Sequence, residues 1–216
     1  AVTNSVTRLA AATAAGIASV DRASDGRAIL GIGRGDSALA HLGLAPARLN
    51  QFETYVRHLQ TYLRGNAVPF DEIEIPDSVA PGVAKLGMAD GPKESRMEWL
   101  ASGRKVPVEV AASGPKVIEI AALHADRIMF TLGADEDRIA WGIRIAREAR
   151  MKAGLDPDGV AFGAYINCAC GENMDRNRDL VRGGLATFAR FSVMHGRPNG
   201  PMSDAAENAL RKLHEM

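Results

Sequence analysis

Strand-like and helix-like segments alternate along most of this chain, and the alternation constrains the fold more than any other feature. Near-continuous apolar runs predict strands at 28–33, 106–112, 127–132 and 160–170. Helical patterns separate them, and in the one after Pro46 apolar residues recur every three or four positions up to Leu63. Apolar strands linked through helices are typical of a parallel sheet covered on both faces, in a doubly wound fold or a (β/α) barrel. Four strands are visible, whereas a closed barrel has eight.

Charge balance and apolar content limit the class of protein. Lys plus Arg equals Asp plus Glu, 26 against 26, so no net field attracts nucleic acid or an anionic membrane. No apolar run is long enough to cross a bilayer, and the histidines show no metal-ligand spacing. We expect one domain over 1–216, with an irregular excursion at 66–102 that is rich in Pro, Gly and Asp. We therefore expect a cytoplasmic protein whose partners are small molecules, with no nucleic acid, membrane or metal.

Three glycines on alternate positions follow the first strand, in the stretch GIGRGD at 31–36. The dinucleotide-binding fingerprint G-x-G-x-x-G needs a glycine where Asp36 stands, and no helical pattern begins before Pro46. Two interpretations stay open. Asp36 could cap the amides of a tight turn. Alternatively, the absent side chains could let a ligand approach the strand end, where Arg34 would bind phosphate and Asp36 would donate a proton.

Two further strand exits carry small and polar residues. In the stretch AASGPK, Pro115 opens a helix, and the free amides there, with the Ser113 hydroxyl and Lys116, form an anion site suited to phosphate. A helix start that needs only a cap explains the same residues equally well. The stretch TLGAD places Thr131 and Gly133 at the next strand end. Since parallel strands send their carboxyl ends to one rim, we expect these exits to lie together.

Four stretches, taken in order, carry a family resemblance: AVTN (1–4), DGRAILGIGRGDSA (25–38), PVEVAASGPKVIEIAALHAD (107–126) and TLGAD (131–135). They resemble the luciferase-like flavin and deazaflavin oxidoreductases, most closely the methylenetetrahydromethanopterin reductase-like branch that uses coenzyme F420. The fold implied is an α/β protein of the (β/α)8 TIM-barrel type. The barrel is incomplete here, because the family's first two strands, most of its third and its last have no counterpart. We expect a longer polypeptide, since an open barrel leaves apolar sheet edges unpaired.

The resemblance also implies a site for a cofactor, which lies across the carboxyl ends of the strands. Coenzyme F420 is expected, with flavin mononucleotide (FMN) as the alternative. A non-prolyl cis peptide supports the cofactor ring in the family, and Ala1-Val2 would occupy its place. Asp36 falls where related enzymes carry an acid near the reacting carbon. The phosphate-binding edge of the family maps onto Ser113, Gly114, Pro115, Lys116, Thr131, Leu132 and Gly133, with Arg34 and Gly35 beside them.

Three functions are compatible with these residues. The leading one is an oxidoreductase that transfers hydride between the deazaflavin and a small organic substrate, with Asp36 as proton donor and segment 66–102 over the substrate. The second, in the same fold, is a luciferase-like monooxygenase that uses reduced FMN and oxygen. The third is a non-catalytic cofactor-binding or subunit-interaction protein that keeps the barrel without turnover. The resemblance further implies a homodimer.

Overall fold

A parallel sheet forms the centre of the computed structural model, which describes every residue except 74, 88–90, 102, 194–198 and 215–216. Its strand order is β1-β2-β5-β6-β7, and each neighbouring pair is parallel. The strands are β1 (Val2–Asn4), β2 (Leu30–Gly33), β5 (Val108–Ala112), β6 (Arg127–Phe130) and β7 (Ala161–Ala164). This open parallel sheet confirms the α/β class and the incomplete barrel, with one strand more than the apolar pattern predicts, the short β1.

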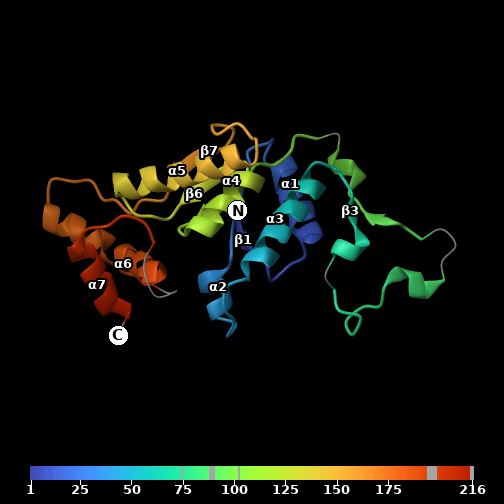
Figure 1. The fold of residues 1–216 in the computed structure, drawn as a ribbon, viewed down its shortest axis with the longest axis horizontal. Coiled ribbons are helices and arrows are strands. Elements are labelled where there is room, and N and C mark those ends of the chain that lie inside the picture. Colours follow the sequence, from blue (N-terminus) through green and yellow to red (C-terminus); the bar gives the residue numbers. More distant parts are fainter. Residues whose placement is uncertain (74, 88–90, 102, 194–198, 215–216) are drawn as a thin grey trace.

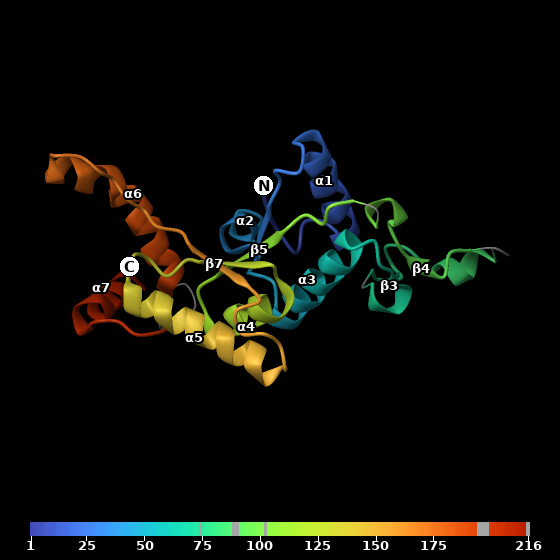
Figure 2. The same cartoon turned by 90° about the horizontal axis from the view of Figure 1, so that it is seen from above.

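Helices connect the strands of the sheet, and two more helices follow the last strand (Figures 1 and 2). They are α1 (Ala10–Ala23), α2 (Asp36–Ala40), α3 (Leu49–Leu63), α4 (Pro115–His124), α5 (Glu136–Lys152), α6 (Met174–Val193) and α7 (Asp204–His214). The short helix α2 contradicts the expectation that no helix begins between the first predicted strand and Pro46, because Gly35, at φ 93°, turns the chain directly into it. None of the described helices is long and apolar enough to span a bilayer.

One face of the sheet forms the core with α1, α3, α4 and α5. Ile32, Val110 and Ile128 are at most 1% exposed on this face, and burying each stabilises the fold by about 1.5–3 kcal/mol. On the other face, Glu109 and Arg127 stand in register and are only half-buried. The expectation that both faces are covered is therefore wrong for this chain. The uncovered face corresponds to the interior of the barrel, which further strands would complete.

Asp126, at the amino end of β6, forms hydrogen bonds with three parts of the structure. Its carboxylate accepts hydrogen bonds from Lys105 Nζ, from the Val108 amide at 2.8 Å and from Gln60 Nε2 of α3 at 3.2 Å. Burial raises the pKa of the Asp126 carboxyl, but these three donors and the charge of Lys105 outweigh it, so that the pKa is lowered overall. The carboxylate thus stabilises the fold in its charged form.

Two regions lie at opposite ends of the molecule, on either side of the sheet (Figure 1). At one end, α6 and α7 pack against each other. At the other, the predicted excursion at 66–102 projects outwards. Its elements are the antiparallel pair β3 (Val68–Pro69) and β4 (Glu94–Ser95) and the 3-10 turns η1 (Phe70–Glu72), η2 (Val83–Leu86) and η3 (Glu98–Leu100). It is attached to α3, where the Tyr62 hydroxyl donates to Ser95 Oγ at 2.8 Å.

The last strand of the sheet is shorter than the apolar stretch 160–170 predicts. Strand β7 ends at Ala164, opposite Phe130, the last residue of its partner β6. Beyond that point β7 lacks a neighbour with which to continue its hydrogen-bond ladder. Cys168 and Cys170 consequently lie outside the strand, and both thiols are free and exposed rather than part of the core.

Candidate active site

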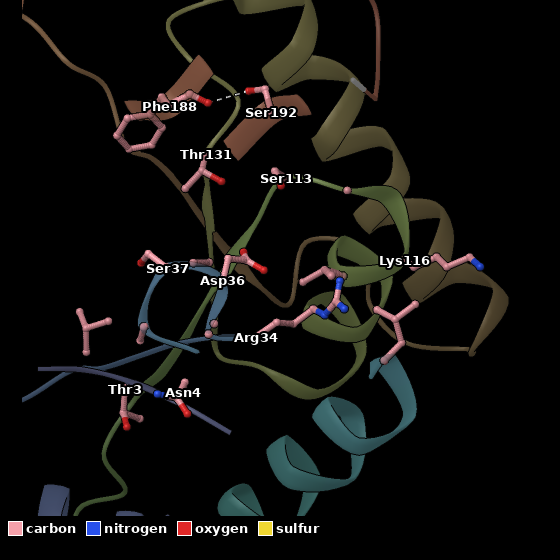
Figure 3. Close-up of a pocket in the computed structure, with 18 of the residues that line it drawn as sticks. Thr3, Asn4, Arg34, Asp36, Ser37, Ser113, Lys116, Thr131, Phe188 and Ser192 are labelled. Atoms are coloured by element: carbon pink, nitrogen blue, oxygen red, sulfur yellow. Dashed lines mark hydrogen bonds between the residues drawn. The ribbon is translucent and has the colours of Figure 1, made fainter. Parts of the chain in front are cut away.

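A cavity of about 800 Å3 opens at the carboxyl edge of the sheet (Figure 3). Segments that are far apart in the sequence meet there: β1, the β2–α2 turn, the β5–α4 turn, the residue after β6, and α6. Of the residues singled out in the sequence, these line it: Val2, Arg34, Gly35, Asp36, Ser113, Gly114, Pro115, Lys116 and Thr131. The structure therefore brings the three strand exits to one place, as parallel strands require.

Ala1, Leu132 and Gly133 do not line the cavity. The amino group of Ala1 donates to the Ile29 carbonyl at 3.0 Å, beside β2. Leu132 is only 5% exposed and belongs to the core, because successive side chains at a strand end point to opposite faces and Thr131 takes the cavity side. Gly133 is exposed. The structure has no cis peptide bond among its described residues, so the expected cis bond at Ala1-Val2 is wrong here.

Asp36 begins α2, and its Oδ1 atom is buried and has no hydrogen-bond partner among the residues that the structure describes. The tight turn before it needs glycine, because a Cβ on Gly35 would lie 2.9 Å from the Leu39 side chain and 3.0 Å from Asn4 Cβ. No side chain caps the start of α2, which argues against the interpretation of Asp36 as a turn cap. A buried acceptor without a partner is costly, so this side chain is placed at some expense in stability.

Arg34 is held beside the cavity by two hydrogen bonds to one residue. Its Nε donates to the Ala47 carbonyl at 2.7 Å, and the Ala47 amide donates to the Arg34 carbonyl at 3.1 Å. The terminal guanidinium nitrogens make no protein hydrogen bond among the described residues. They remain available for an anion, for which the planar guanidinium fork is well suited.

The start of α4 presents free amides to the same cavity. Gly114 is the N-cap, Pro115 the first helical residue, and no side chain makes a capping hydrogen bond. The sequence left open whether this helix start needs only a cap, and in the structure the amides are free to bind an anion. Lys116 is exposed, and its amino group extends away from Asp36 and Thr131 (Figure 3). It therefore belongs to the rim.

The charges around the cavity favour an anionic ligand. Among the described residues, three cationic side chains line it, those of Arg8, Arg34 and Lys116, against one carboxylate, that of Asp36. Across the described part of the chain, no group of three or more His, Cys, Asp or Glu side chains could hold a metal ion.

The luciferase-like monooxygenase family matches residues 1–215 of this sequence. The chain belongs to this family. A curated family relative, the 5,10-methylenetetrahydromethanopterin reductase of Methanolobus tindarius, is 32% identical over 166 residues, which are 76% of this chain and 45% of the relative. The protein of the same name from Archaeoglobus fulgidus is 27% identical over 218 residues, 98% of this chain and 59% of the relative. The chain thus spans about half the length of these relatives.

A solved structure supports the family fold. The coenzyme F420-dependent tetrahydromethanopterin reductase of Methanopyrus kandleri superposes with a TM-score of 0.65 at 20% identity, over 87% of this chain and 55% of that one. The resemblance that the strand-exit motifs predict is therefore confirmed for the family and for the fold.

Several cavity residues were missed in the sequence. Thr3 and Asn4 stand within AVTN, the stretch that carries the family resemblance, and that was the one signal available for them. Phe188 and Asn199 had no signal, because they reach the cavity only through the path of the chain after β7. The Phe188 ring stacks on Tyr165, with centroids 5.0 Å apart and planes inclined by 16°. In contrast, no described residue of the excursion 66–102 lines the cavity, so the described part of this segment does not cover it.

Proposed function

We propose that this chain carries the cofactor site of an oxidoreductase that uses coenzyme F420 to transfer hydride to or from a small organic substrate. The observation that supports it most is the meeting of Arg34, Ser113 and Thr131 in one cavity, at the carboxyl edge of a parallel sheet. The relatives point to the same chemistry, since two are named methylenetetrahydromethanopterin reductase and a similar structure is named F420-dependent.

The cavity fits a cofactor with a planar ring and an anionic tail. Its volume of about 800 Å3 lies in the range of cofactor pockets, roughly 300–1,000 Å3. The free amides of α4 and the guanidinium of Arg34 are suited to a phosphate. When bound, the deazaflavin supplies the hydride-carrying carbon. The residues proposed to contact the cofactor are Ala1, Val2, Arg34, Gly35, Ser113, Gly114, Pro115, Lys116, Thr131, Leu132 and Gly133, of which Ala1, Leu132 and Gly133 lie outside the cavity wall.

The residues of the chain have separate parts in the reaction we propose. Asp36 exchanges a proton with the substrate through its carboxyl group, for which its place in the cavity wall is suited. Arg34 orients the anionic group, because its own orientation is set by the Ala47 carbonyl. We further propose a cytoplasmic homodimer that acts on a small molecule.

The purified chain is titrated with F420 and with FMN, and binding is followed by ligand fluorescence. We expect F420 to bind. Asp36→Asn should keep the affinity for F420 and slow hydride transfer by about 10²–10⁴-fold, the usual contribution of a positioned acid. Asp137→Asn, which changes an exposed carboxylate at the start of α5, is the matched control and should leave the rate unchanged. Failure of F420 to bind, or an unchanged rate in Asp36→Asn, would refute the proposal.

A luciferase-like monooxygenase with FMN is the second candidate, favoured by the description of the matching family. It predicts that FMN binds more tightly than F420 and that turnover of reduced FMN consumes oxygen. A non-catalytic protein predicts cofactor binding without turnover in the unsubstituted chain. The same titrations, followed by an assay of hydride transfer, therefore separate the three functions.

A further inference from the structure

Asn199 lies at the cavity, although it is 84 residues beyond Pro115, the first residue of α4. Its Nδ2 atom is 3.7 Å from the position that a Cβ on Gly114 would take. Gly114 is the N-cap of α4, and no side chain caps the amides that follow it. The carboxamide of Asn199 is therefore next to the part of the cavity that is best suited to an anion.

Two contacts with α5 hold the backbone of Asn199 in place. Arg138 Nη2 donates to the Asn199 carbonyl at 3.0 Å. The following residue, Gly200, has φ +88°, and a Cβ there would lie 2.9–3.1 Å from the indole of Trp141. The backbone thus rests against the indole, where another side chain would not fit. These two contacts with α5 therefore fix the position of Asn199 beside the cavity.

The carboxamide has unused hydrogen-bonding capacity. No hydrogen bond of the Asn199 side chain occurs among the described residues, whereas an amide nitrogen can donate two. The absent side chain at Gly114 leaves space between the β5–α4 turn and Asn199 Nδ2. A phosphate oxygen bound at the α4 amides would be within reach of this nitrogen, and a neutral donor complements the positive charge of Arg34 without adding repulsion between cations.

We propose that Asn199 donates a hydrogen bond from Nδ2 to the phosphate of the bound cofactor, and that Arg138 acts on the cofactor indirectly, by positioning Asn199. The inference rests on the proposed function and adds a residue from the segment after α6 to the phosphate site. It assigns the two ends of the cofactor to different parts of the chain, with the phosphate near Asn199 and the reacting ring near Asp36.

The test compares F420 with its 8-hydroxy-5-deazariboflavin core, a fragment with the same ring and ribityl chain that lacks the phosphate and the lactyl-glutamate tail attached to it. Asn199→Ala should weaken F420 binding about tenfold, the effect of one hydrogen bond to a charged group. Asn199→Asp should weaken it further, because a carboxylate repels the phosphate. For the 8-hydroxy-5-deazariboflavin core, the Kd of both variants should stay within about twofold of that of the unsubstituted chain. Asn208→Ala, an exposed asparagine of α7, is the control and should change neither affinity.

Arg138→Met provides an independent variant, because it removes the positioning contact and leaves the carboxamide intact. Arg138→Met should also weaken the binding of F420 more than the binding of the phosphate-free fragment. Thermal unfolding shows whether each variant is folded. If the Asn199 variants bound both ligands more weakly to the same extent, or bound F420 as tightly as the unsubstituted chain does, the assignment of Asn199 would be overturned. The proposed function would remain. If the unsubstituted chain binds neither ligand, the proposed function fails, and the assignment fails with it.

Discussion

Gly142 lies in the middle of α5, and its missing side chain allows the helix to approach β6 closely. A Cβ at this position would lie 2.8 Å from Cε1 of Phe130 and 3.1 Å from Cδ1 of Leu132. Phe130 is fully buried, and its ring stacks on Phe162 with centroids 5.9 Å apart, so it has no free space into which to move. We predict that Gly142→Ala destabilises the protein.

Two effects of opposite sign determine how much the free energy of unfolding changes in Gly142→Ala. Alanine in a helix interior is more favourable than glycine by about 0.8–1.0 kcal/mol. Inserting a methyl group into a packed core costs about 1–3 kcal/mol, and the rigid ring of Phe130 places this site in the upper half of that range. The free energy of unfolding should therefore fall by about 1–2 kcal/mol, which lowers the Tm by roughly 2–8 °C in a domain of this size.

Gly16→Ala is the matched control, because it makes the same substitution in α1 without the steric conflict. Gly16 is exposed, and outside the backbone of its own helix no atom of the described residues lies within 4 Å of the position of its Cβ. The helix propensity acts alone there and should raise the free energy of unfolding by about 0.5–1 kcal/mol. Urea denaturation followed by circular dichroism measures both variants. If Gly142→Ala stabilised the protein as much as Gly16→Ala does, the packing argument would be refuted.

Three further predictions concern pH, a turn and the anion site. The lowered pKa of Asp126 stabilises the fold at a pH above its ordinary value of 3.8 and ceases to do so as the pH falls through the lowered value. In urea titrations between about pH 5 and 2, Asp126→Asn should therefore lose less stability on acidification than the unsubstituted chain, and equal losses would contradict this. Gly65→Ala should lower the Tm, because Gly65 has φ +71° and a Cβ would lie 2.5 Å from the Ala101 backbone; an unchanged melting curve would contradict it. Arg34→Lys should weaken F420 binding about tenfold in fluorescence titrations, since lysine lacks the planar fork, and an unchanged Kd would exclude Arg34 from the anion site.

The order of helices and strands was predictable because its signals are local. Apolar residues at three- and four-residue spacing in α3, such as Phe52, Val56 and Leu59, indicate a helix within a few turns, and all three are fully buried. The boundaries were less predictable. Strand β7 ends where β6 ends, and α2 begins because of the backbone conformation of Gly35, and neither depends on the apolar pattern alone.

The candidate site was predictable only in part. Ser113 and Thr131 follow apolar strands, and the parallel direction of those strands is sufficient to place them at one edge. Phe188 and Asn199 come from α6 and the chain after it, which packs at the end of the sheet without a periodic signal that specifies where. Their place at the cavity depends on contacts such as that of Gly200 with Trp141.

The sequence by itself determined the alternation of elements, the parallel sheet and the strand exits that share an edge, because each follows from short-range periodicity and from the direction of the chain. Only the tertiary structure decided which groups face one another. In it, Asp36 Oδ1 is buried and has no partner among the described residues, Leu132 lies in the core, and Asn199 lies next to Gly114. These positions depend on packing between segments that are far apart in the sequence. The packing energy is shared among many contacts, so no single stretch of sequence predicts it.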